Sequence, residues 1–138
     1  MIKEIIASID ELNSVVNYLN ETTPKDAIIF LVGNLASGKT TLTAHIAKAK
    51  GIEAEVISPT FSLQHCYGDG FYHYDLYRIE HSEFMELGLF EEFDKSGWHM
   101  IEWGGEVLKA FLLGAGYDVF TVTITPCNDK RQYQIERN

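Results

Sequence analysis

The chain has 138 residues, of which 46% are hydrophobic and 22% are charged, so we expect one folded domain around a single core rather than disorder or low complexity. Its formal net charge of −9 argues against broad binding to nucleic acid, because that mode needs clustered lysines and arginines. Since the N-terminus has no leader of the secretory type and no apolar run is long enough to span a membrane, we expect a cytoplasmic protein without membrane contact.

The first half of the chain predicts a helix, a strand and a second helix. Residues 8–22 open with the Ser-x-x-Glu spacing of a capping box and carry apolar residues at intervals of three and four, and Thr-Pro ends this helix. Residues 27–32 are continuously apolar, which is typical of a strand buried on both faces. A glycine-rich segment follows, and then a second amphipathic helix that Gly51 ends.

The second half predicts short strands, hairpins and helices. We expect a strand at 54–57, a hairpin formed by 61–66 and 71–76, one or two short helices with an acidic outer face at 80–94, a strand at 98–103, a helix at about 105–112, and a last hairpin formed by 118–125 and 132–137. With the first half, this order predicts an α/β fold of the P-loop NTPase type. It would be a single domain over residues 1–138, with a central mixed sheet that contains antiparallel hairpins and is flanked by helices.

The glycine-rich segment has the pattern Gly-x-x-x-x-Gly-Lys-Thr, directly between the predicted strand and helix. Backbone N–H groups of such a loop surround a phosphate, and the helix adds its positive N-terminal end. Lys39 would reach the terminal phosphates, and the hydroxyl of Thr40 can bind Mg²⁺. We therefore expect a nucleotide to contact the loop residues Gly33, Asn34, Leu35, Ala36, Ser37, Gly38, Lys39, Thr40 and Thr41.

A phosphate loop of this kind needs a second Mg²⁺ ligand, usually an acid at the end of a neighbouring strand. Glu102 is the first candidate because it ends a short, mostly apolar strand, and the alternative is a merely exposed strand-end acid. Asp75 is the second candidate, with the alternative that it only pairs with Arg78 to fix a turn. Thr60, in Ser-Pro-Thr-Phe, could sense the terminal phosphate as a switch residue, or belong to an ordinary proline turn.

The type of nucleotide and the rate of hydrolysis are inferred from what the sequence lacks. No Asn-Lys-x-Asp segment, which reads guanine, is present, so ATP and ADP are favoured over guanine nucleotides. Phosphoryl transfer is accelerated by a positively charged finger, and of the chain's arginines we expect only Arg78 near the site. The sequence therefore predicts slow hydrolysis that a partner stimulates.

Taken together, these residues resemble the bacterial TsaE family, also called YjeE. The resemblance covers nearly the whole chain and rests on landmarks in the family's order and spacing: the loop Gly33 to Thr41, Ser58-Pro59-Thr60-Phe61, His73-Tyr74-Asp75-Leu76-Tyr77-Arg78, Glu86-Leu87-Gly88-Leu89 and Ile101-Glu102-Trp103. The loop departs from the family at two positions, since Ala36 and Ser37 stand where glycine and alanine are common.

The resemblance implies a cytoplasmic ATPase of tRNA threonylcarbamoyladenosine biosynthesis. It would support turnover of the partner proteins TsaD and TsaB, which modify the adenosine beside the anticodon, and its contact with tRNA would be indirect. By position, Lys39 would hold phosphates, Thr40 and Glu102 would bind Mg²⁺, Thr60 would act as the switch residue, Asp75 would help to organise the hydrolytic site, and Trp103 would lie near the nucleotide.

Two other functions are alternatives on the sequence alone. One is a non-hydrolysing binding module, in which ATP stabilises a conformation that partners recognise and the acidic face of residues 80–94 is the docking surface. The other is a small metabolite kinase. Such kinases usually need a lid with several arginines, and this chain has no basic lid segment, so the sequence disfavours this function.

Overall fold

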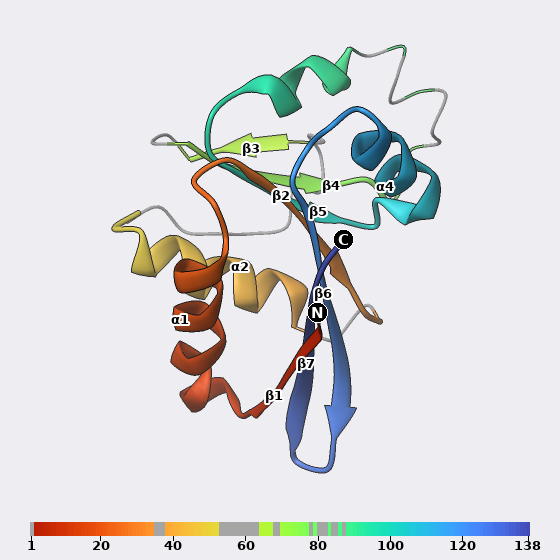
Figure 1. Cartoon of the computed structure of the whole chain (residues 1–138). Helices are drawn as coiled ribbons and strands as arrows, with labels where there is room; N and C mark the ends of the chain where they lie inside the picture. Colours follow the sequence, from red (N-terminus) through yellow and green to blue (C-terminus); the bar gives the residue numbers. More distant parts are fainter. Residues whose placement is uncertain are drawn as a thin grey trace.

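Seven β-strands form one mixed sheet in the computed structural model of the chain, which describes residues 2–34, 38–52, 64–67, 70–77, 79, 83, 86 and 88–138 (Figure 1). The order of the strands across the sheet is β1-β7-β6-β2-β5-β4-β3. Their bounds are β1 Ile2–Ala7, β2 Ala27–Val32, β3 Gln64–Cys66, β4 Phe71–Asp75, β5 Trp98–Glu102, β6 Val119–Cys127 and β7 Lys130–Arg137.

The parallel centre of the sheet determines where its functional edge lies. Strand β2 pairs in parallel with β5 on one side and with β6 on the other, and β5 pairs in parallel with β4. The carboxyl ends of these strands therefore meet at one edge, which is the edge where ligands bind in open α/β sheets. The outer pairs, β3 with β4, β6 with β7 and β7 with β1, are antiparallel.

Helices cover both faces of this sheet. Their bounds are η1 Ile9–Glu11, α1 Asn13–Thr22, α2 Lys39–Ala49, η2 Leu89–Asp94 and α4 Gly105–Gly114, where η marks a 3₁₀ helix. Helices α1 and α2 pack on one face against Ile29 and Leu31 of β2, whereas α4 and η2 pack on the other face against Ile28 and Phe30 (Figure 1). Because both faces of β2 are buried as far as Leu31, its sequence is continuously apolar, as predicted.

The N-terminal region differs from the sequence prediction. The expected helix from residue 8 is split into the 3₁₀ turn η1 and the helix α1, although the predicted capping-box contact is present: the backbone N–H of Ser8 donates to the Glu11 carboxylate at 3.0 Å. Strand β1 is absent from the prediction. Its sequence Ile-Lys-Glu-Ile-Ile-Ala has no strict alternation, and most of its side chains are exposed at the edge of the sheet. The strand is ordered by pairing with β7, at the other end of the chain.

The last hairpin is tighter than predicted, and this places its returning strand at the functional edge. Strands β6 and β7 leave only Asn128 and Asp129 between them, whereas the sequence predicted a longer turn at 126–130. Asn128 has a φ of 57°, the left-handed conformation that two-residue hairpin turns favour for asparagine. Pro126 pairs with Arg131, so Arg131 lies at the carboxyl end of β6.

The other predicted elements are confirmed or lie outside the described residues. Strands β3 and β4 form the predicted hairpin, β5 and α4 lie within a residue or two of the predicted bounds, and Gly51, with a φ of 82°, follows the end of α2 as predicted. The predicted strand at 54–57, the loop with Thr60 and parts of the acidic segment at 80–94 lie outside the described residues. No helix in the described part of the chain combines the length and apolarity that a membrane span requires.

Candidate functional site

Lys39 begins helix α2 and folds back over the phosphate loop. Only 3% of the residue is exposed, and its Nζ donates to the carbonyl oxygens of Gly33 at 2.7 Å and Asn34 at 3.1 Å. The ring of Trp103 covers the same ammonium, with Nζ 3.9 Å from the ring centroid. The lysine charge is therefore held within the loop rather than extended into solvent.

Thr40, the next residue, connects the loop to strand β5. Its hydroxyl donates to Oε2 of Glu102 at 3.0 Å. Glu102 ends β5, the direct neighbour of β2, and is only 4% exposed, so the alternative of a merely exposed strand-end acid is wrong. A hydroxyl and a carboxylate that meet in this way are oxygen ligands of the kind that Mg²⁺ prefers. The donor set at the end of β5 therefore fits this ion.

Asp75 lies beside Glu102, because β4 and β5 are parallel and the two residues are direct partners in the register. Its Oδ1 accepts a hydrogen bond from the backbone N–H of Tyr77 at 3.0 Å. Burial lowers the pKa of Lys39, and the charges of Glu102 and Asp75 oppose this shift, so both acids act electrostatically on the loop lysine. The structure thus brings both candidate acids to the edge where the loop lies.

Trp103 has a backbone conformation that residues other than glycine rarely adopt, with a φ of 61°. Such a conformation costs about 1–3 kcal/mol. The ring lies against Lys39 on one side and contacts Tyr77 edge-on, with 5.0 Å between the two ring centroids. The backbone at Trp103 is therefore bent where its side chain covers the loop lysine.

Of the remaining predicted residues, some lie within the described part of the chain and others lie outside it. Gly38 is the N-cap of α2, and Thr41 lies in the first turn of that helix, where its carbonyl oxygen is 3.0 Å from Nδ1 of His45. Several predicted residues lie outside the described part of the chain, and their roles stay predictions: Leu35, Ala36, Ser37, Thr60 and Arg78.

Arg131, which the sequence analysis missed, lies directly against the loop. Gly38 has a φ of 101°, and a Cβ at this position would collide with the guanidinium of Arg131. Nη1 of Arg131 is buried and has no hydrogen-bond partner within the described residues. The expectation that only Arg78 approaches the site is therefore wrong. No local pattern signals this approach, because it depends on the long-range position of the β6–β7 hairpin.

His73 on β4 is a second residue that the sequence analysis did not assign to the site. Its side chain is fully buried, and its Nε2 lies 2.5 Å from Oε2 of Glu102. An ionised carboxylate only accepts hydrogen bonds, so Nε2 carries the donated hydrogen. The sequence held a signal here, because residues two apart on a strand share a face and His73 is two residues before Asp75.

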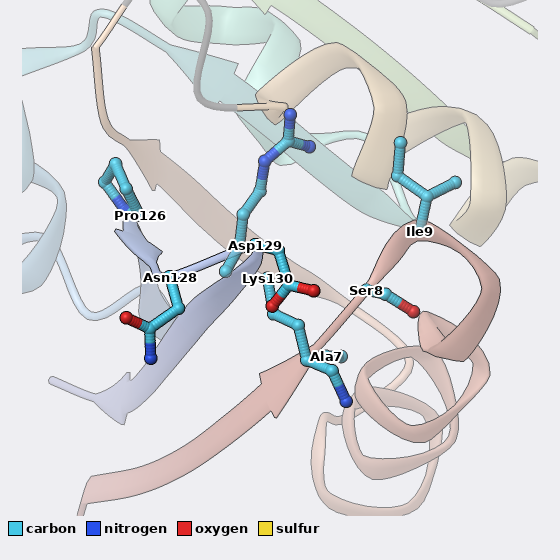
Figure 2. A pocket seen from close by; sticks show the side chains of 8 residues that line it. Ala7, Ser8, Ile9, Pro126, Asn128, Asp129 and Lys130 are labelled. Atoms are coloured by element: carbon cyan, nitrogen blue, oxygen red, sulfur yellow. The ribbon is translucent and has the colours of Figure 1, made fainter.

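A hollow of about 330 Å³ opens near the loop at the same edge of the sheet. Figure 2 shows it between the end of β1 and the β6–β7 turn; its lining residues are Ala7, Ser8, Ile9, Pro126, Asn128, Asp129, Lys130 and Arg131. Arg131 both lines this hollow and lies against Gly38. The guanidinium of Arg131 therefore lies between the hollow and the phosphate loop.

The mixed sheet, with a glycine loop between β2 and α2, defines an α/β protein of P-loop NTPase-like fold. The crystal structure of Bacillus subtilis YdiB superposes on it with a TM-score of 0.70 and 24% sequence identity, covering 99% of this chain and 87% of that chain. A sequence model of the family "Threonylcarbamoyl adenosine biosynthesis protein TsaE" matches residues 6–134. The chain belongs to the TsaE family, whose members take part in tRNA threonylcarbamoyladenosine biosynthesis.

Curated relatives that are named TsaE come from several bacteria. The chain is 35% identical over 120 residues to the tRNA threonylcarbamoyladenosine biosynthesis protein TsaE of Bacillus subtilis (strain 168), which covers 79% of this chain and 75% of that protein. It is 42% identical over 74 residues to the protein of the same name from Nostoc sp.. That match covers 51% of this chain and 46% of the Nostoc protein, so it spans about half of each.

Proposed function

We propose that this protein binds ATP or ADP with Mg²⁺ at the phosphate loop and hydrolyses ATP slowly, as a subunit that supports turnover of a TsaD–TsaB complex in tRNA modification. The observation that carries the proposal is the hydrogen bond at 3.0 Å between Thr40 and Glu102, beside the buried Lys39. It joins a loop hydroxyl to a strand-end carboxylate, the pair with which phosphate-loop proteins hold Mg²⁺.

Each residue of the site would have a role that follows from the chemistry of its side chain. Lys39 and the N-terminal end of α2 would bind phosphate oxygens. Thr40 and Glu102 would hold Mg²⁺, which when bound neutralises charge on the phosphates. Asp75, beside Glu102, would help to organise the hydrolytic site, and Trp103 would respond to the nucleotide because its ring covers the loop lysine.

The nucleoside would lie on the β6–β7 side of the loop. The hollow there has a volume of about 330 Å³, which is within the range of small-ligand pockets. Arg131 lies between this hollow and Gly38, at the positive N-terminal end of α2. A cation at that end of a helix is unfavourable by itself and is stabilised by an anion. Arg131 would therefore bind phosphate oxygens of a nucleotide whose base occupies the hollow.

The distribution of charge supports slow hydrolysis by the protein alone. Strand order β7-β6-β2-β5-β4 puts Arg131 and the acids Asp75 and Glu102 on opposite sides of the loop strand. On the acidic side, Thr40 and His73 contact the carboxylate of Glu102, and Asp75 accepts a hydrogen bond from the backbone N–H of Tyr77. A positive group that a partner places beside the phosphates would accelerate phosphoryl transfer.

The partners that we propose are TsaD- and TsaB-type proteins. The curated relatives are named for tRNA threonylcarbamoyladenosine biosynthesis. The net charge of −9 makes a partner a better surface for tRNA than this chain, so tRNA would be bound only through the partners. Since the proposed role is in tRNA modification, we also propose the cytoplasm as its place of action.

ATP binding by the purified protein tests the nucleotide site. Lys39→Ala should weaken ATP affinity about tenfold or more in a calorimetric titration, because it removes a charged contact to phosphate. Lys50→Ala is the matched control: Lys50 follows the other end of α2, and its Nζ lies 3.7 Å from the ring centroid of Trp98. We expect the control to bind ATP like the wild type. A wild-type protein that binds no ATP would contradict the proposal.

Variants of Asp75 distinguish a hydrolysing subunit from a non-hydrolysing binding module. Asp75→Asn keeps the size of the side chain and an oxygen for the Tyr77 N–H, and it removes the charge beside Glu102. We expect ATP binding to persist while hydrolysis falls about a hundredfold, as for the loss of a group that assists proton transfer. If tRNA modification by the assembled proteins continues at the wild-type rate while hydrolysis is lost, the non-hydrolysing module is the better description.

A further inference from the structure

We propose that His73 is a positioning residue for Glu102: it fixes the orientation of this carboxylate toward the metal ion and does not itself contact the ion. The inference rests on the proposed function, in which Glu102 is a Mg²⁺ ligand. It concerns a histidine on a neighbouring strand, and its evidence is the hydrogen bond between the two side chains, their burial and the unpartnered second nitrogen of the imidazole.

The contact between the two side chains is short and closed to solvent. Nε2 of His73 lies 2.5 Å from Oε2 of Glu102, and their side chains are 0% and 5% exposed. The register explains the approach: His73 is paired with Met100, and Glu102 lies two residues further along β5 on the same face. The strands themselves therefore bring the imidazole to the carboxylate.

The two donors to Glu102 converge on one oxygen. Oε2 accepts from Nε2 of His73 and from the hydroxyl of Thr40 at 3.0 Å, and no hydrogen bond joins Oε1 to a described residue. Two donors on one oxygen restrain rotation of the carboxylate and leave its other oxygen for a ligand. Hydrogen bonds of this kind orient metal-binding carboxylates. The donor from His73 is part of the sheet and does not depend on the conformation of the phosphate loop.

The second nitrogen of the imidazole argues against a purely packing role. Nδ1 of His73 is buried without a hydrogen-bond partner within the described residues. Burying an unpaired polar atom is unfavourable, and an apolar side chain would fill the same space without that cost. The histidine has one polar contact in its described surroundings, the carboxylate of Glu102, and this contact accounts for an imidazole at this position.

Metal binding, measured apart from hydrolysis, tests the inference. Mn²⁺ in place of Mg²⁺ is titrated into protein saturated with ADP and followed by electron paramagnetic resonance, and ADP affinity without metal is measured by calorimetry in EDTA. His73→Leu should weaken Mn²⁺ binding about ten- to a hundredfold, the usual effect of removing such a hydrogen bond, and leave metal-free ADP affinity unchanged. His99→Leu is the matched control, because His99 is equally buried on β5 and its nitrogens contact Tyr74 and Lys95 rather than Glu102.

A second pair of variants keeps the test independent of the stability of His73→Leu. The side-chain amide nitrogen of glutamine can reach the place of Nε2 and donate to Glu102. The amide nitrogen of asparagine lies at the place of Nδ1, too far from Glu102 to donate to it. We therefore expect His73→Gln to bind Mn²⁺ close to the wild type and His73→Asn to bind it as weakly as His73→Leu. Mn²⁺ affinity equal to the wild type in His73→Leu or His73→Asn would overturn this inference alone. A wild-type protein with no ADP-dependent Mn²⁺ binding, or a Glu102→Gln variant that binds Mn²⁺ normally, would overturn the proposed function and this inference with it.

Discussion

Gly38 meets two separate constraints. Its φ of 101° strains any residue with a side chain, and a Cβ would also displace the guanidinium of Arg131. Gly51 shares the first constraint, with a φ of 82°, and no described residue lies within 4 Å of the place where its Cβ would be. We expect both Gly38→Ala and Gly51→Ala to lose about 1 kcal/mol of unfolding free energy from backbone strain. Only Gly38→Ala should also weaken ATP binding; denaturant unfolding and calorimetry measure the two effects.

The approach of Arg131 to the loop gives a second prediction. Removing a charged hydrogen bond to phosphate should weaken ATP affinity about tenfold in Arg131→Ala. The buried ring of Tyr133, whose pKa is raised by burial and lowered by Arg131, is a neighbour of this guanidinium, so unfolding is measured alongside binding. Arg137→Ala is the control, because Arg137 is an exposed arginine of the same strand that pairs with Asp118. Equal ATP affinities of wild type and Arg131→Ala would show that Arg131 does not bind the nucleotide.

Single residues also show what sequence can and cannot predict about the site. The pattern of strand ends was enough to place Glu102 and Asp75 at the same edge as Lys39, because parallel strands end together. His73 needed one more step, the alternation of side chains along β4. The position of Arg131 could not be predicted from the sequence, since its approach to Gly38 depends on the position of a hairpin far along the chain.

An ion pair joins η1 to the start of β7. Nζ of Lys130 lies 2.9 Å from Oε1 of Glu11, which also accepts a hydrogen bond from the backbone N–H of Ser8. The hydrogen bond from Ser8 is the larger cause, and Lys130 the next, by which the pKa of Glu11 is lowered from 4.5 to about 2. The pair therefore connects two elements whose ends border the hollow near the phosphate loop.

The lowered pKa predicts how stability depends on pH. Because the folded state favours the ionised carboxylate, its contribution to unfolding free energy is complete above pH 4.5 and is lost as pH falls toward 2. Wild type should lose more unfolding free energy over this range than Glu11→Gln, as measured by denaturant unfolding at several pH values. Asp10→Asn, a change of the neighbouring exposed acid, is the control. Parallel pH profiles of wild type and Glu11→Gln would contradict this account.

Elements with a strong local pattern agree best with the sequence prediction. Strand β2 is apolar on both faces, and β5 and α4 have bounds close to those expected. Strand β1 has no such pattern, because it is an edge strand with mostly exposed side chains, and its place is fixed by pairing with β7. The predicted turn around Asn128 was too long because proline is typical of loops, whereas Pro126 lies within β6.

The charge of the chain bears on the partners that we propose for it. The chain is strongly acidic, with a net charge of −9, and belongs to a family of tRNA threonylcarbamoyladenosine biosynthesis. An acidic protein is poorly suited to hold tRNA by itself. The acids and the arginine of the site lie on opposite sides of the loop strand. Under the proposed function, the protein would therefore depend on its partners both for binding tRNA and for fast hydrolysis.

The most direct test of this account is ATP hydrolysis by the purified protein, alone and with TsaB and TsaD, for wild type and Lys39→Ala. We expect slow hydrolysis by the wild type alone, an increase of about tenfold or more when both partners are present, and none above background for Lys39→Ala. Full-rate hydrolysis by the isolated protein, or no stimulation by TsaB and TsaD, would contradict the account.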